Sequence, residues 1–155
     1  MNSCCFTGHR NMTLSARKQI IPALTQKIEQ LINEGVAVFI NGGALGFDTL
    51  SALCVLSLKV KYPKIQLHIY VPHKGQQDKW NEENKKTYDY ILSKADKVKV
   101  LAPFHDAGCM QARNRRMVDD SDCVIAYIKK SSGGAYYTAA YAESQDKKVF
   151  YINGE

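Results

Sequence analysis

The sequence predicts an α/β fold in which a mostly parallel sheet of about six strands carries helices on both faces. Short apolar runs alternate with amphipathic segments over the whole length of the chain. The apolar runs are continuous, which is typical of strands that are buried on both faces of a parallel sheet. Strand and helix signals therefore succeed each other regularly, as in parallel strands that are joined by crossover helices.

In the first half of the chain, the strand and helix signals are well separated. The expected strands are Cys4–Thr7, Val36–Ile40 and Ile65–Val71, and the expected helices are Leu14–Asn33 and about Phe47–Lys59. Apolar residues recur at helical spacing in the first of these helices, and Gly35 is a natural C-terminal stop. Pro72 is expected to end the third strand.

The second half continues the alternation. Helices are expected at Lys79–Lys94, Met110–Asp119 and Tyr136–Gln145, and strands at Val98–Leu101, Cys123–Ile128 and Val149–Ile152. There is no internal repeat and no linker-like segment in the sequence. We therefore expect one domain over residues 1–155.

Composition excludes several classes of protein. Lys and Arg number 21 and Asp and Glu 15, and 45% of the 155 residues are hydrophobic, which does not fit a disordered chain. The longest apolar run, Val36–Ile40, is far too short for a membrane span, and no signal peptide is evident. Four of the five cysteines, Cys4, Cys5, Cys54 and Cys123, lie in apolar surroundings and are expected to be free, which predicts a cytoplasmic protein. The cysteines also lack zinc-site spacing, so we expect no required metal or cofactor. The net charge of +6 permits an anionic ligand.

In open parallel sheets, ligands bind beyond the carboxyl ends of the strands, and four loops at this edge have unusual chemistry. The first loop is Thr7-Gly8-His9-Arg10, where the guanidinium suits a phosphate group. The second is Asn41–Asp48, in which Gly42, Gly43 and Gly46 would expose backbone N–H groups at a helix start. Asp48 would cap that helix or accept a hydrogen bond from a ribose hydroxyl. Each loop also has a purely structural interpretation, as a surface residue pair or a tight packing turn.

The other two loops follow the same logic. The third loop is Arg113-Asn114-Arg115-Arg116, whose three arginines would repel one another unless an anion or nearby acidic residues neutralise them. The acidic residues Asp119, Asp120 and Asp122 follow closely, so at least one arginine is expected to be structural. The fourth loop, Ser131–Ala135, holds Ser132, Gly133 and Gly134, with Thr138 four residues further on. It repeats the physical character of the second loop at another strand–helix junction, and together they would bind two phosphates, or a phosphate and a sugar.

These motifs resemble known bacterial proteins. The segments Gln111–Met117, Asp122–Ala126, Gly133–Ala140 and Asn41–Asp48 resemble DNA-processing protein A, while Thr7–Arg10 and Trp80–Glu82 look more like the stand-alone YpsA-like branch of the SLOG superfamily. The likeness covers nearly the whole chain. It implies a Rossmann-like fold whose crevice binds a nucleotide-derived ligand, with these site candidates: Gly8, Arg10, Gly42, Gly43, Gly46, Asp48, Arg115, Gly133, Gly134 and Thr138.

The same resemblance implies two alternatives to a binding module. The LOG enzymes of the superfamily hydrolyse the N-glycosidic bond of nucleoside monophosphates, and carry a glutamate in their glycine-rich turn. Here that glutamate is missing and Glu143 lies about a helical turn late, so Asp48 and Glu143 are the candidate carboxylates. DNA-processing protein A binds single-stranded DNA, but no aromatic and basic groove is evident in the sequence.

The first hypothesis is therefore a sensor or binding module for a nucleotide derivative. Arg10 and Arg115 would hold phosphate, the glycine turns would donate N–H groups, and Asp48 would accept from ribose. Hydrolysis of a nucleoside monophosphate and binding of single-stranded DNA remain as alternatives. An exposed apolar helix face would also allow a homodimer.

Overall fold

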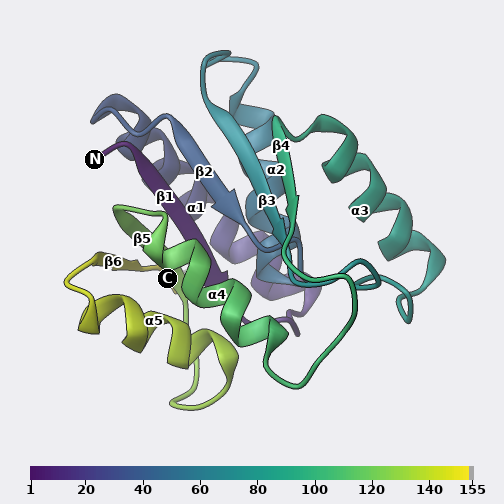
Figure 1. Ribbon diagram of the computed structural model, residues 1–155. Coiled ribbons are helices and arrows are strands. Elements are labelled where there is room, and N and C mark those ends of the chain that lie inside the picture. The colour runs from purple at the N-terminus through teal and green to yellow at the C-terminus, as the bar shows by residue number, and fades with distance from the viewer. Residues whose placement is uncertain (154–155) are drawn as a thin grey trace.

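A six-stranded parallel sheet forms the centre of the molecule (Figure 1). The computed structural model describes residues 1–153. The strands are β1 (Ser3–Gly8), β2 (Val38–Asn41), β3 (Gln66–Val71), β4 (Lys97–Val100), β5 (Cys123–Tyr127) and β6 (Lys148–Tyr151). Their order is β4-β3-β2-β1-β5-β6. The predicted α/β, Rossmann-like architecture and its parallel sheet are thus confirmed.

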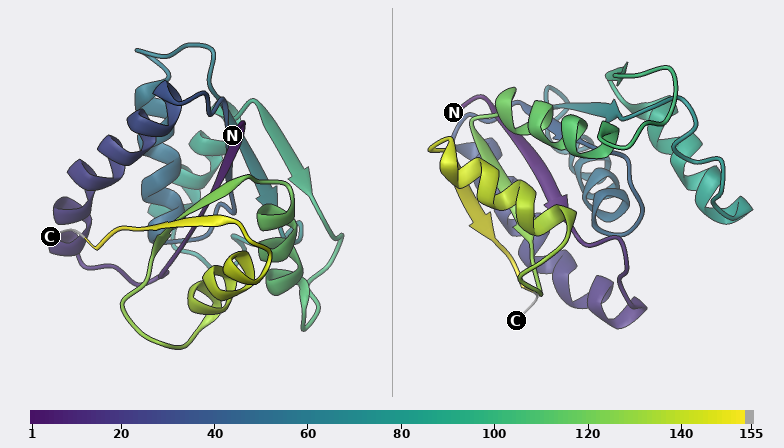
Figure 2. Two further views of the ribbon diagram at one scale, coloured as in Figure 1. Left: turned by 90° about the vertical axis from the view of Figure 1, so that its left-hand side faces the viewer. Right: turned by 60° about the horizontal axis from the view of Figure 1, so that its bottom comes forward.

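Five helices cover the two faces of the sheet (Figures 1 and 2). They are α1 (Leu14–Asn33), α2 (Phe47–Leu58), α3 (Glu82–Lys94), α4 (Cys109–Asp119) and α5 (Gly134–Ser144). The larger core cluster joins the sheet to α1, α2 and α3, and includes Phe6, Phe39 and Phe47. The smaller cluster joins the opposite face to α4 and α5 through residues such as Met117 and Ala142.

Local signals explain where the helices begin. The Thr13 hydroxyl accepts from the Ala16 N–H at 3.0 Å and caps α1, which has the predicted bounds. Asn81 caps α3 in the same way, by accepting from the Asn84 N–H at 2.8 Å. Because of this cap, α3 begins at Glu82, later than the predicted Lys79.

All five cysteines are free, and Cys4, Cys5 and Cys123 are buried in the strands as small apolar residues. None of the helices within residues 1–153 is long and apolar enough to cross a membrane.

The strand order determines where a crevice opens at the edge of the sheet. Strand β1 pairs with β2 on one side and with β5 on the other. The chain leaves β1 toward α1 on one face of the sheet, and leaves β5 toward α5 on the other face (Figure 1). A crevice opens where connections diverge in this way, which is where open α/β sheets bind ligands.

Candidate functional site

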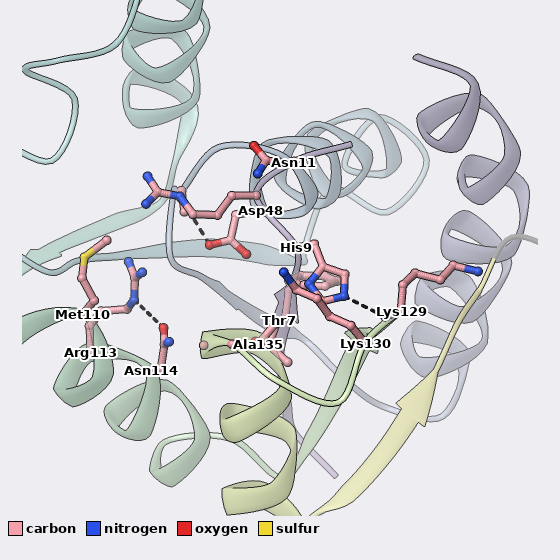
Figure 3. Close-up of a pocket in the computed structure, with 16 residues that line it drawn as sticks. Thr7, His9, Asn11, Asp48, Met110, Arg113, Asn114, Lys129, Lys130 and Ala135 are labelled. Carbon is pink, nitrogen blue, oxygen red and sulfur yellow. Dashed lines mark hydrogen bonds between the residues drawn. The ribbon is translucent and has the colours of Figure 1, made fainter. Parts of the chain in front are cut away.

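A cleft of about 620 Å³ lies at the carboxyl ends of β1 and β5, and Figure 3 shows the side chains around it. This volume falls within the range of small-molecule binding sites. Its walls come from three parts of the chain: the end of β1 with the following loop, the start of α5 with the loop before it, and α4. The floor includes Ala44 and Asp48 from the β2–α2 connection.

The wall formed by α5 presents unpaired backbone donors to the cleft. Gly133 precedes α5 with φ at +95°, and no side chain caps the helix. The first N–H groups of a helix have no intrahelical partner and carry a partial positive charge. A Cβ built on Gly134 would have no heavy atom within 4 Å, so protein packing does not require glycine there. The open space beside Gly134 is available to a ligand.

Two cations reinforce this wall. Arg10 and Lys130 line the cleft, and neither makes an ion pair within residues 1–153. Lys129 differs, because its ammonium group donates to the Asn153 carbonyl at 3.0 Å and extends away from the cleft (Figure 3). Arg10 and Lys130 are therefore the cations that remain available to an anionic ligand.

His9 connects the two loops that flank the cleft. Its Nε2 accepts a hydrogen bond from the backbone N–H of Lys129 at 2.7 Å, and its ring packs edge-on against Tyr127. Burial and the nearby charge of Lys130 lower the pKa of the His9 imidazole, which keeps Nε2 free to accept. His9 thus acts as a positioning residue for the loop before α5.

In the loop between β2 and α2, side chains of the same loop accept hydrogen bonds from the backbone N–H groups. The Asn41 Oδ1 accepts from the Gly43 N–H at 2.8 Å, and the Asp48 Oδ2 accepts from the Ala44 N–H at 3.2 Å. These groups are buried, so the turn holds a carboxylate of the protein where an anionic ligand was expected. The expected phosphate-binding role of Gly42 and Gly43 is therefore not supported by the geometry.

Packing explains the glycines of this loop and of β1. A Cβ at Gly42 would lie 2.7 Å from both the Arg113 Nη1 and the Asp48 Oδ2. Gly46 has φ at +76°, and a side chain there would overlap the backbone of the loop after β1. Gly8 faces the Phe47 ring in the same close way, so the absence of a side chain at Gly8 makes room for that ring.

Asp48 is the carboxylate at the floor of the cleft. Burial raises its pKa to about 6, while Arg113, the Ala44 N–H and Arg10 act in the opposite direction. The side chain is 7% exposed and lines the cleft. It is placed to accept a hydrogen bond from a hydroxyl group of a ligand or to exchange a proton with it.

The three arginines of α4 have different environments. Arg113 is 3% exposed and its Nη1 donates to the carbonyl oxygens of Gly42 and Tyr70, at 2.5 and 3.1 Å. Arg115 is exposed on α4 and lies over the Tyr141 ring at 5.2 Å, outside the cleft lining. Arg116 pairs with Asp120 at 3.1 Å. The structural arginine is thus Arg113, and the structure does not bring Arg115 to the predicted phosphate site.

Some of the predicted site residues line the cleft, and others lie outside it. Thr7, Gly8, His9, Arg10, Asp48, Arg113, Asn114, Gly133 and Gly134 line the cleft. Ser132 is exposed and outside its lining, and the Thr138 hydroxyl donates to the Gly134 carbonyl at 2.7 Å inside α5. Glu143 is also outside, where it accepts from the Tyr151 hydroxyl at 2.6 Å. Among residues 1–153, no cluster of three or more His, Cys, Asp or Glu side chains suits a metal ion.

Five residues that line the cleft lie outside the four loops predicted from the sequence: Phe6, Asn11, Met110, Lys129 and Lys130. The lysines follow the end of β5 after one intervening residue, next to the strand pair at which the connections diverge. Their position after a strand end was a usable signal, but it required knowledge that β5 lies beside β1. Met110 had no such signal, because an apolar residue at a helix start usually packs in a core.

Comparison with known proteins identifies the family. The model of the YpsA family, described as the YspA SLOG family, matches residues 4–153. The chain belongs to the YpsA SLOG family. The resemblance inferred from its motifs is confirmed.

The chain is also similar to proteins from bacilli and related bacteria. The chain is 29% identical to a UPF0398 protein of Bacillus pumilus, over 98% of this chain and 88% of that protein. It is 30% identical to a UPF0398 protein of Halalkalibacterium halodurans, over 94% of this chain and 76% of that protein.

Solved structures of DNA processing protein A share the fold. The Helicobacter pylori protein, which binds single-stranded DNA, superimposes with a TM-score of 0.69 at 22% identity. The Streptococcus pneumoniae protein gives a TM-score of 0.69 at 20% identity. Each match covers 97% of this chain, but the chain spans only 64% and 50% of those two proteins.

Proposed function

We propose that the protein binds a nucleotide or a nucleotide derivative in the cleft between β1 and β5. The observation that supports this most directly is the uncapped start of α5, where Gly134 opens onto the cleft without a packing reason. Backbone N–H groups at a helix start favour phosphate, and Arg10 and Lys130 add positive charge.

The rest of the cleft suits the remainder of a nucleotide. The Asp48 carboxylate lies on the floor, away from the α5 wall, where it would accept from the ribose hydroxyls (Figure 3). Met110 contributes an apolar, polarizable surface on the α4 side for the face of a base. Buried Arg113 holds the β2–α2 connection in place, and so preserves the position of Asp48.

Isothermal titration calorimetry tests this assignment. The ligands are AMP, ADP, ADP-ribose and NAD, with adenosine as the ligand that lacks phosphate. Lys130→Ala should weaken binding of the phosphate-bearing ligand by about tenfold or more, which corresponds to about 1.4 kcal/mol, and should leave adenosine unaffected. Arg115→Ala is the matched control, because it removes an exposed arginine outside the cleft.

The proposal fails if no nucleotide binds, or if the Lys130 and Arg115 variants lose equal affinity. A thermal-shift measurement gives an independent readout. A ligand at 100 times its dissociation constant stabilises a protein by about 2.7 kcal/mol, which is readily seen in the melting temperature.

A second candidate function is binding of single-stranded DNA. Tyr136 and Tyr137 form an exposed edge-to-face pair at the start of α5, with ring centroids 5.6 Å apart. Together with Arg115 over Tyr141, they supply aromatic and basic surface that was not evident from the sequence. This candidate requires affinity for an oligonucleotide that falls steeply with salt and is lost in Tyr137→Ala.

Hydrolysis of a nucleoside monophosphate has weaker support. Glu143 is outside the cleft, which leaves Asp48 as the one carboxylate among the cleft-lining residues. Release of free base from AMP, abolished in Asp48→Asn, would establish the reaction.

A further inference from the structure

Strand β4 forms one margin of the sheet, and within residues 1–153 its only strand neighbour is β3 (Figure 1). Directly after β4, the Leu101 N–H donates to the Val71 carbonyl of β3 at 2.9 Å. Successive residues of a strand direct their backbone groups to opposite edges, so those of Val98 and Val100 point away from β3. An open edge of this kind is a surface on which another extended chain can pair.

The side chains of β4 form a cationic row and an apolar row. Lys97 and Lys99 lie on the face that carries α4 and α5, where the Lys99 ammonium lies over the Tyr70 ring at 5.1 Å. Val98 and Val100 lie on the other face and are 40% and 49% exposed. Neither lysine makes an ion pair among the described residues. The open edge of β4 is therefore flanked by positive charge on one face and by exposed apolar side chains on the other.

The opposite margin of the sheet, β6, has a different character. Its Val149 and Phe150 pack against the core clusters, and the Tyr151 hydroxyl donates to Glu143 at 2.6 Å. Each of these side chains already has a partner within the protein, whereas the two valines of β4 belong to neither core cluster. Of the two edges, β4 is therefore the better suited to bind a further strand.

We propose that the edge of β4 binds an extended, acidic segment of another protein, in which acidic and apolar residues alternate. Such a segment would add to the sheet as a further strand and pair with the backbone groups of Val98 and Val100. Residues that lie opposite each other in paired strands share a face of the sheet. The acidic side chains would therefore lie beside Lys97 and Lys99, and the apolar ones beside the valines. This surface is separate from the nucleotide cleft, which lies at the ends of β1 and β5.

Two other occupants fit the edge less well. In a symmetric antiparallel pair of β4 strands from two copies of the chain, lysines would lie opposite lysines, because opposite residues share a face. Like charges in that position destabilise the pair. A single-stranded nucleic acid would supply negative charge, but it lacks the regularly spaced N–H and C=O groups that pair with a strand. Charge and edge geometry together favour an acidic peptide segment.

Fluorescence anisotropy on the full chain tests the proposal with a labelled peptide of about six residues, the usual length of a strand, in which Glu and Val alternate. A peptide of the same composition with its glutamates grouped together is the matched control, and should bind at least about fivefold more weakly. Two further peptides carry N-methyl groups on all the valines or on all the glutamates. One of them should lose at least about tenfold in affinity and the other should keep it, because only alternate residues direct their N–H groups toward β4.

Charge reversal on the protein adds a test in which a gain of binding is expected. The double variant Lys97→Glu, Lys99→Glu should lose the Glu–Val peptide and should bind a peptide in which Lys and Val alternate. The double variant Lys18→Glu, Lys148→Glu makes the same change of charge at exposed positions on α1 and β6, and should behave as the wild type. Because the first variant gains a ligand, a failure to fold is distinguished from a loss of the site.

Several results would overturn the proposal. If the Glu–Val peptide does not bind, the lysines serve only to keep this edge from pairing with other chains. Equal binding of the grouped peptide, or equal effects of the two N-methylations, would show attraction between charges without strand addition. An oligodeoxynucleotide that binds more tightly than the peptide, and is lost in the Lys97 and Lys99 variant, would assign this face to nucleic acid. Each of these outcomes leaves the proposed nucleotide site in the cleft untouched.

Discussion

Replacement of Arg113 by alanine should destabilise the fold far more than the same change at Arg115, two positions along the same helix. The Arg113 guanidinium is buried and donates to two backbone carbonyls. Hydrogen bonds from charged donors contribute about 1.5–3 kcal/mol each. Its removal also takes away one of the two positive charges that favour the ionised form of the buried Asp48 carboxylate, the other being Arg10. Because these terms overlap, we expect a loss of about 4 kcal/mol.

Urea denaturation at pH 7.5, monitored by circular dichroism, measures this loss in the free energy of unfolding. For a chain of this size, about 4 kcal/mol corresponds to a fall in melting temperature of roughly 8–16 °C. Arg115→Ala removes an exposed side chain and should change the free energy of unfolding by no more than about 0.5 kcal/mol. The reasoning is refuted if Arg113→Ala stays within about 1 kcal/mol of the wild type, or if the two variants lose equal stability.

Two further predictions concern the glycines and the pH dependence. Gly134→Ala should keep or slightly raise the melting temperature but weaken nucleotide binding, because the new methyl group enters open space beside the cleft. Gly46→Ala should lower the melting temperature, because Gly46 has a positive φ and a side chain there would overlap the backbone. Equal melting temperatures of the two variants in thermal-shift assays would contradict this. Burial raises the pKa of Asp48 in the folded protein, so the folded state binds the Asp48 proton more tightly than the unfolded state does. This proton therefore stabilises the fold fully below the pKa that Asp48 has in the unfolded chain, and the stabilisation is lost as pH rises to about 6. Asp48→Asn should remove this dependence, and an unchanged stability profile between pH 4 and about 7 would count against it.

The fold was predictable because nearly every element carries its own signal. Strands such as Cys123–Tyr127 are continuous apolar runs, and α1 has a regular apolar stripe with Gly35 beyond its end. Most predicted boundaries differ from the observed ones by no more than one residue, and the larger differences lie at the starts of β2, α3 and α5. Asn81 delayed the start of α3, and α5 began at Gly134, before the predicted Tyr136, because glycines carry no apolar signal.

The candidate site was predictable at the level of loops but not of individual side chains. Helical spacing shows that Arg113 and Arg115 point in different directions, but not which of them faces the sheet. That choice depends on how α4 crosses the sheet after β4, a long-range feature with no local signal. Lys130 was missed for the same reason, because its value depends on the pairing of β5 with β1.

The two glycine-rich turns show why similar sequences do not imply similar chemistry. In the β2–α2 turn, the chain supplies its own carboxylate, and Asp48 occupies the Ala44 N–H that an anionic ligand would need. In the β5–α5 turn, no side chain caps the helix and Gly134 has open space beside it. A phosphate is therefore favoured only on the α5 side. On the other side Asp48 makes the cleft unsuitable for a second phosphate and suitable for a hydroxyl donor, which sets the direction in which a nucleotide would lie.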